Sequence, residues 1–162
     1  MAASLDTTLD RVAAQCARRG AQLTELRRQV LRLVLESEHP VGAYTLLDRL
    51  KTLRGAAAPP TVYRALDFLL EQGLIHKVER LNAFLGCAET GQEEHAHGEG
   101  EGQQHEHPHQ FLICRRCGTT AEISDPAIVA ALASASAHAG FTLHRATVEA
   151  EGVCAGCADG IA

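Results

Sequence analysis

Residues 58–73 read APPTVYRALDFLLEQG and contain the best-defined helix of the chain. Pro59 and Pro60 suit the first turn of a helix, where a backbone N–H would have no partner, and Gly73 suits the position just past its end. One stripe at helical spacing is apolar, with Val62, Ala65, Leu66 and Leu69. The sequence therefore predicts an amphipathic helix whose other face carries Tyr63, Arg64, Asp67 and Glu71.

The sequence on both sides of this helix predicts a winged helix-turn-helix. Upstream, apolar residues at helical spacing predict helices over residues 5–19, 24–37 and 43–53, the second capped by Thr24. Downstream, residues 74–79 and 83–87 predict two short strands that turn at Leu81-Asn82. A helix followed by a two-stranded ribbon forms a wing, so we expect residues 1–87 to be a winged-helix DNA-binding domain.

The rest of the chain predicts a linker and a second domain. Residues 88–110 are rich in Glu, Gly, Gln and His and lack apolar periodicity, which indicates a hinge and loop. Strands are predicted over residues 111–114, 119–123 and 141–150, and a helix over residues 126–139. The expected fold class is α+β, with residues 111–162 as a small α/β domain.

Composition and charge narrow the class of protein. The 162 residues are 46% hydrophobic, enough to bury a core. No run of about 18 apolar residues predicts a membrane span, and the N-terminus does not resemble a signal peptide, so we expect a cytoplasmic protein with no membrane partner. Residues 1–80 carry 12 Lys and Arg against 9 Asp and Glu, whereas residues 81–162 carry 3 against 11. This asymmetry indicates one half that can approach phosphates and another that can collect cations.

Two Cys-x-x-Cys pairs are the strongest chemical signal. Two thiolates three positions apart can hold one metal ion across a tight turn, and two such turns make the closed tetrahedral site of a structural zinc. A disulfide framework is disfavoured in a reducing cytosol. The remaining alternatives are a pair of redox-active dithiols or incidental buried cysteines. The predicted zinc ligands are Cys114, Cys117, Cys154 and Cys157.

A second group of potential ligands mixes His, Cys and carboxylate side chains. His76 and Cys87 belong to the predicted wing strands, whereas Glu122 and the histidines of residues 95–109 belong to the loop and the second domain. Such a set suits a zinc site that releases its ion more readily than four thiolates do, and one ion bound by both parts would fix the angle between the domains. The alternative is a solvated tract that binds metals unspecifically, which fits best the residues His95, His97 and His105. A lone histidine such as His76 is more often structural.

The N-terminal end of the 58–73 helix is the predicted DNA contact. In a helix-turn-helix this end enters the major groove, where Arg can bond guanine O6 and N7 and Tyr can contact a base or a phosphate. An exposed Arg on a helix is usually only solvated, so the prediction depends on the winged-helix context. The candidate residues are Thr61, Tyr63 and Arg64.

These segments resemble the ferric uptake regulator family. Residues 58–73, followed by Ile75-His-Lys-Val-Glu79, resemble its recognition helix and wing, and Phe111-Leu-Ile-Cys-Arg-Arg-Cys-Gly118 looks most like the zinc uptake regulator branch. The resemblance covers nearly the whole chain. Residues 89–106 depart from it, because they form a longer segment that is richer in His.

The resemblance implies a function and assigns residues to it. It implies that residues 111–162 are a metal-binding dimerisation domain. It also implies that the homodimer, with zinc as co-repressor, binds a palindromic AT-rich DNA operator and represses zinc uptake genes. It implies two zinc ions per subunit: a structural ion at the four cysteines and a regulatory ion at His76, Cys87, His107 and Glu122. His105 and His109 are the alternates to His107, and base reading falls on Tyr63 and Arg64.

Three other functions stay open at this point. A regulator of the same family could sense iron, manganese or peroxide, although the Cys87 thiolate favours zinc. A zinc hydrolase needs an open coordination position, and the sequence has no His-Glu-x-x-His spacing, so we expect no enzyme. A zinc buffer or chaperone would use the His-rich loop and would not need Tyr63 or Arg64.

Overall fold

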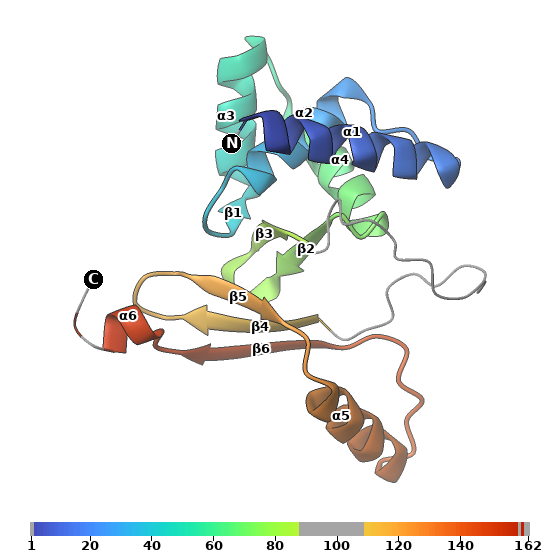
Figure 1. Cartoon of the computed structure of the whole chain (residues 1–162), viewed down its shortest axis with the longest axis vertical. Helices are drawn as coiled ribbons and strands as arrows, with labels where there is room; N and C mark the ends of the chain where they lie inside the picture. Colours follow the sequence, from blue (N-terminus) through green and yellow to red (C-terminus); the bar gives the residue numbers. More distant parts are fainter. Residues whose placement is uncertain (1, 88–108, 159, 161–162) are drawn as a thin grey trace. The chain divides into compact units, whose positions relative to one another are not determined.

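The computed structural model describes residues 2–87, 109–158 and 160. The chain divides into two compact units, Met1–Gly98 and Glu99–Ala162, and each contains its own three-stranded sheet (Figure 1). Among the described residues, no helix combines the length and the apolar character needed to cross a membrane.

Four helices build the first unit, and they confirm the helices predicted from the sequence. They are α1 (Ala2–Arg18), α2 (Glu25–Leu35), α3 (Ala43–Arg54) and α4 (Pro59–Glu71). Thr24 caps α2, since its side chain accepts a hydrogen bond from Arg27 N. Gly55 ends α3 in the left-handed conformation (φ 75°), which glycine adopts without strain.

The wing follows α4 as an antiparallel ribbon of β2 (Ile75–Val78) and β3 (Ala83–Gly86). The chain reverses between the strands through a short 3-10 turn at Glu79–Leu81, followed by Asn82 in the left-handed conformation (φ 45°). The two predicted strands are therefore confirmed. A third strand, β1 (Val41–Gly42), pairs with β3; two residues are too few to show a pattern in the sequence.

The apolar faces of the four helices meet in one core that also receives residues of the wing. Its fully buried side chains include Leu9 and Val12 of α1, Leu31 of α2, and Leu66 and Leu69 of α4. Each such side chain stabilises the fold by roughly 1.5–3 kcal/mol relative to exposure. This core holds α4 in place and leaves its polar face open.

The second unit is a sheet in the order β5-β4-β6. Its elements are β4 (His109–Cys114), β5 (Thr120–Ile123), α5 (Pro126–His138), β6 (Thr147–Gly152) and the short α6 (Ala155–Ala158). β4 pairs antiparallel with β5 and parallel with β6. A parallel pair needs a long crossover connection, and α5 lies within it.

Two boundaries in this unit differ from the prediction. β4 begins at His109 and includes Gln110, although the sequence predicts a loop up to residue 110; the Gln110 side chain is only 1% exposed and bonds to the backbone of Asp125. The strand predicted over residues 141–150 is wrong at its start, since β6 begins only at Thr147. Phe141 and Leu143 are 74% and 44% exposed. The alternation of apolar and polar residues here therefore belongs to an exposed segment and not to a strand.

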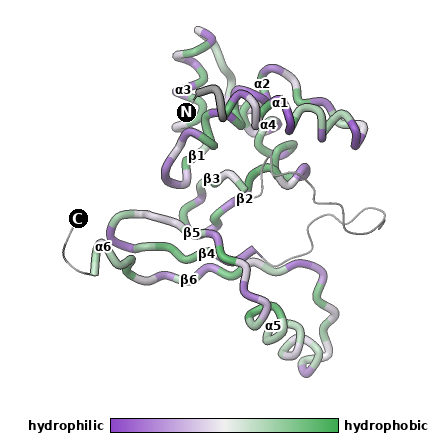
Figure 2. Tube along the Cα trace, in the orientation of Figure 1, coloured by the Kyte–Doolittle hydropathy of each residue, from purple (hydrophilic) through white to green (hydrophobic). Residues whose placement is uncertain are grey.

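Within its described residues, the second unit buries few apolar side chains: Phe111, Ile113, Cys114 and Cys157. α5 buries none, although Figure 2 shows that much of it is hydrophobic. A unit with so little core needs another source of stability, such as a bound metal or a partner chain.

Candidate metal sites and nucleic-acid interface

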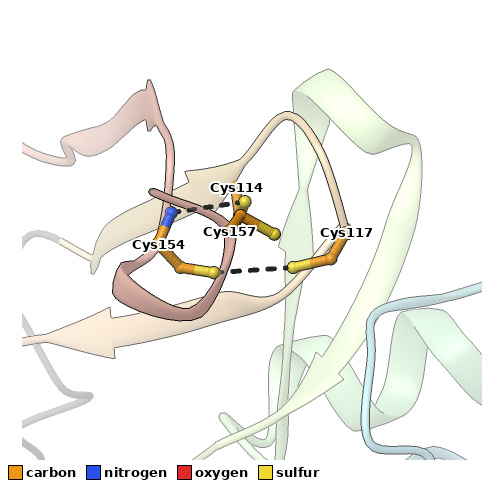
Figure 3. Close-up of side chains that lie close together, drawn as sticks. All are labelled: Cys114, Cys117, Cys154 and Cys157. Carbon is orange, nitrogen blue, oxygen red and sulfur yellow. Dashed lines mark hydrogen bonds between the residues drawn. The ribbon is translucent and has the colours of Figure 1, made fainter. Parts of the chain in front are cut away.

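The four cysteines of the two Cys-x-x-Cys pairs come together at one end of the second sheet (Figure 3). Cys114 ends β4, and the parallel register places it beside Gly152, the last residue of β6. Cys154 follows directly after β6, and Cys157 lies in α6. The β4–β6 pairing thus brings two turns that are far apart in the sequence into contact.

The sulfur atoms are arranged as a single ion would require. All four Sγ atoms lie within 4.8 Å of one another, and Cys117 Sγ is 3.7 Å from Cys154 Sγ. Gly118 turns the first knuckle with φ 76°, and its N–H donates to Cys114 O at 2.9 Å. Arg116 Nη1 donates to Cys157 O at 2.5 Å and so ties the two knuckles together.

The surroundings of the cluster favour thiolate on the first knuckle. The backbone N–H of Cys154, 3.3 Å from Cys114 Sγ, is the main cause that lowers the pKa of Cys114 to about 6, helped by the N–H groups of Cys117 and Arg116. Hydrogen bonding to Thr119 lowers the pKa of Cys117. The neighbouring Cys117 thiol and burial raise the pKa of Cys157 to about 12.

This donor set fits zinc. Four sulfur ligands on two knuckles leave no place for water, which is the arrangement of a structural zinc site and not of a catalytic one. Zinc would replace the thiol protons that otherwise remain within the cluster, since the thiolate is the metal ligand. The sequence prediction for these residues therefore agrees with their geometry.

The wing places two further candidate ligands on one face of the ribbon. Cys87 N donates to Leu74 O at 3.1 Å, so Cys87 lies opposite Leu74 in the ribbon. His76 follows Leu74 by two residues along the chain. Residues two apart on a strand point to the same face, so His76 and Cys87 are diagonal neighbours. His76 is buried, with only 6% of its surface exposed.

The second unit contributes a similar pair. His109 Nδ1 lies 3.7 Å from Glu122 Oε1, and the two side chains are 21% and 19% exposed. The ring of His109 also stacks on Phe111, with 6.4 Å between centroids, which helps to fix its direction. The predicted ligand His107 and its alternate His105 lie outside the described residues.

α4 presents the predicted DNA contacts on its open face. Thr61, Tyr63 and Arg64 are exposed, whereas Val62 and Ala65 between them are buried in the core. The alternation of exposed and buried positions fixes which side of α4 can meet a ligand.

The structure adds Tyr44, which the sequence analysis did not single out. It is 73% exposed at the start of α3 and shares a cavity of about 240 Å³ with Tyr63. A signal was present in the sequence, since Tyr44 lies off the apolar stripe that Leu46, Leu47 and Leu50 define. Tyr is enriched at interfaces because its ring is apolar and its hydroxyl can form a hydrogen bond, so Tyr44 is a candidate contact beside Tyr63.

Comparison with known proteins assigns the chain. The sequence profile of the ferric uptake regulator family matches residues 18–151. This chain belongs to the ferric uptake regulator family. Within that family it is 39% identical over 144 residues to the zinc uptake regulation protein of Escherichia coli K12, covering 89% of this chain and 77% of that protein. The zinc uptake regulation protein of Shigella flexneri matches equally well.

Solved structures of the ferric uptake regulator family agree with the observed fold. A zinc uptake regulator complexed with zinc and DNA superposes with a TM-score of 0.80 at 37% identity, over 96% of this chain and 95% of that one. The holo form of XcZur superposes with a TM-score of 0.76 at 40% identity, over 93% and 96%. The prediction of a winged helix joined to a small α/β unit is confirmed.

Proposed function

We propose that this protein is a zinc-responsive, DNA-binding repressor of zinc uptake genes, with zinc as its co-repressor. One observation carries the proposal: a chain with a four-thiolate site and an exposed Tyr63–Arg64 helix face matches, over nearly its whole length, a regulator complexed with zinc and DNA. It acts as a regulator in the cytoplasm and not as an enzyme.

Each subunit holds two zinc ions in this proposal. The structural ion is held by Cys114, Cys117, Cys154 and Cys157. The regulatory ion is held by His76 and Cys87 of the first unit together with Glu122 and His107 of the second. The 3.7 Å approach of His109 to Glu122 supports a ligand site at this end of β4 and keeps His109, with His105, as an alternate to His107.

The regulatory ion converts zinc concentration into DNA affinity. Zinc supplies a single centre that ligands from both units can share. Once it is bound, the wing and the second unit are held at one angle, and the two α4 helices of a dimer meet successive major grooves of a palindromic AT-rich operator. Coupling of this kind is reciprocal, so operator DNA also raises the affinity for zinc.

The homodimer that this mechanism needs is supported by the second unit. α5 is apolar without burying a residue in its own chain, and Leu112 and Phe141 are 48% and 74% exposed. Exposed apolar surface on a small unit is typical of an interface. We place the dimer contact there.

Selection from a random DNA pool tests the proposal. The full-length protein is incubated with the pool at buffered free zinc concentrations, and parallel samples contain iron or manganese. Enrichment of a palindrome only as free zinc rises is the expected result. Enrichment with iron or manganese would transfer the protein to another branch of the family, and no enrichment with any metal would favour zinc buffering.

A further inference from the structure

An acidic residue, Asp67, lies on the same face of α4 as Tyr63 and Arg64. It follows them by four and three positions, a spacing that aligns side chains along one side of a helix. Its side chain is exposed, and within the described residues it forms no hydrogen bond or ion pair. A free carboxylate on the proposed DNA-reading face requires a physical reason.

The cavity that Asp67 lines does not supply that reason. Its charged lining residues are Asp67 and Lys77, but Lys77 Nζ already pairs with Glu79 Oε2 at 2.6 Å. The other polar side chains around the cavity, including Tyr44, Tyr63 and Asn82, are uncharged. Within the described residues no ion pair joins the Asp67 carboxylate to Lys77 or to Arg64, so it does not balance a cation of its own chain.

DNA offers one favourable partner for such a group. Phosphates repel a carboxylate, because each strand carries a negative charge about every 3.4 Å. In the major groove, however, the amino group on C4 of cytosine is a donor that Asp and Glu accept from. We propose that Asp67 is a specificity-determining residue that reads a cytosine of the operator through this amino group.

The position of that cytosine follows from helix geometry. Three residues of an α-helix advance about 4.5 Å along its axis, and successive base pairs are about 3.4 Å apart. Asp67 therefore reads a base one or two pairs from the guanine that Arg64 reads. The inference rests on the proposed DNA-binding function and adds a second base pair whose identity the protein recognises.

The test is selection from a random DNA pool with the zinc-loaded, full-length protein and its Asp67→Asn, Asp67→Ala and Glu71→Gln variants. Glu71 is the matched control, because it is an exposed acid on the same helix and also forms no ion pair within the described residues. An Arg64→Ala sample locates the guanine position. Circular dichroism and zinc content confirm that each variant is folded and loaded.

We expect the unsubstituted protein to prefer cytosine, one or two base pairs from the Arg64 guanine, by about tenfold. Asp67→Asn should change this preference to adenine, which Asn bonds through N6 and N7, and Asp67→Ala should lose it. Glu71→Gln should keep it. If Asp67→Asn and Glu71→Gln instead raised affinity for all sequences equally, Asp67 would only repel phosphate and the inference would be wrong. No palindrome with the unsubstituted protein would overturn the proposed function itself.

Discussion

The side-chain amide of Gln110 bonds to both backbone groups of Asp125. Gln110 Nε2 donates to Asp125 O at 3.1 Å, and Asp125 N donates to Gln110 Oε1 at 3.1 Å. Asp125 in turn caps α5, since its carboxylate accepts from Ala127 N at 2.8 Å. One buried polar side chain on β4 therefore determines where α5 begins.

Replacing Gln110 by Ala should destabilise the second unit by about 1–3 kcal/mol. The substitution removes two part-buried hydrogen bonds to the backbone of Asp125, and each such bond contributes roughly 0.5–1.5 kcal/mol. Asp125→Ala is the matched control, because it removes only the cap and should cost about 1 kcal/mol. Urea unfolding of the zinc-loaded protein at fixed concentration measures both; equal losses would mean that Gln110 merely fills space.

The first unit could be predicted from the sequence because local signals and burial agree there. Thr24 caps α2, Pro59 and Pro60 begin α4, and the stripe of Val62 to Leu69 enters the core as its spacing requires. The four cysteines could be predicted for a related reason. The paired Cys-x-x-Cys spacing predicts a metal site from the sequence alone, independently of the surrounding fold.

The second unit is harder to predict because few of its apolar residues are buried within their own chain. The sequence pattern predicts a strand at Phe141 and Leu143, yet both side chains are exposed. It predicts a loop at Gln110, yet this side chain is buried and bonds to a residue 15 positions away. Neither partner chains nor long-range hydrogen bonds leave a periodic pattern in a sequence.

Removing zinc with a strong chelator should unfold the second unit and leave the first folded. The large apolar core lies within residues 1–87, whereas the second unit buries four apolar side chains among its described residues. Metal binding and folding are linked in such small units. Hydrogen exchange should show lost protection in β4 and β6 and retained protection in α2 and α4. Uniform loss across the chain would contradict this division.

The two proposed zinc sites should respond differently to loss of one thiol. Cys114→Ser removes a buried ligand whose sulfur also accepts from Cys154 N, so the second unit should lose its fold and its zinc. Cys87→Ser should leave a folded protein that retains one zinc per subunit and no longer binds DNA in response to added zinc. Zinc analysis and thermal unfolding distinguish these results, and one shared phenotype would show that the sites are not separate in role.

Arg64→Ala should weaken operator binding by about 1–3 kcal/mol without changing zinc content, because it removes a proposed base contact and none of the proposed zinc ligands. Arg64→Lys is the informative companion. Lys keeps the charge but lacks the planar fork that bonds guanine O6 and N7 together. If Arg64→Lys binds the operator as weakly as Arg64→Ala does, Arg64 reads guanine. If Arg64→Lys keeps full operator affinity, Arg64 contacts only phosphate. Fluorescence anisotropy at one salt concentration measures the series.

Phe141→Glu should convert the proposed dimer into monomers. Phe141 is 74% exposed in its own chain and follows an α5 that buries no residue, so we expect this ring to leave water in the proposed dimer contact. A carboxylate buried there without a partner would cost several kcal/mol. Tyr44→Glu is the matched control, because Tyr44 is 73% exposed but lies in the first unit. Sedimentation velocity of the zinc-loaded proteins should show monomers for Phe141→Glu and dimers for Tyr44→Glu. Dimers in both would move the interface away from this surface.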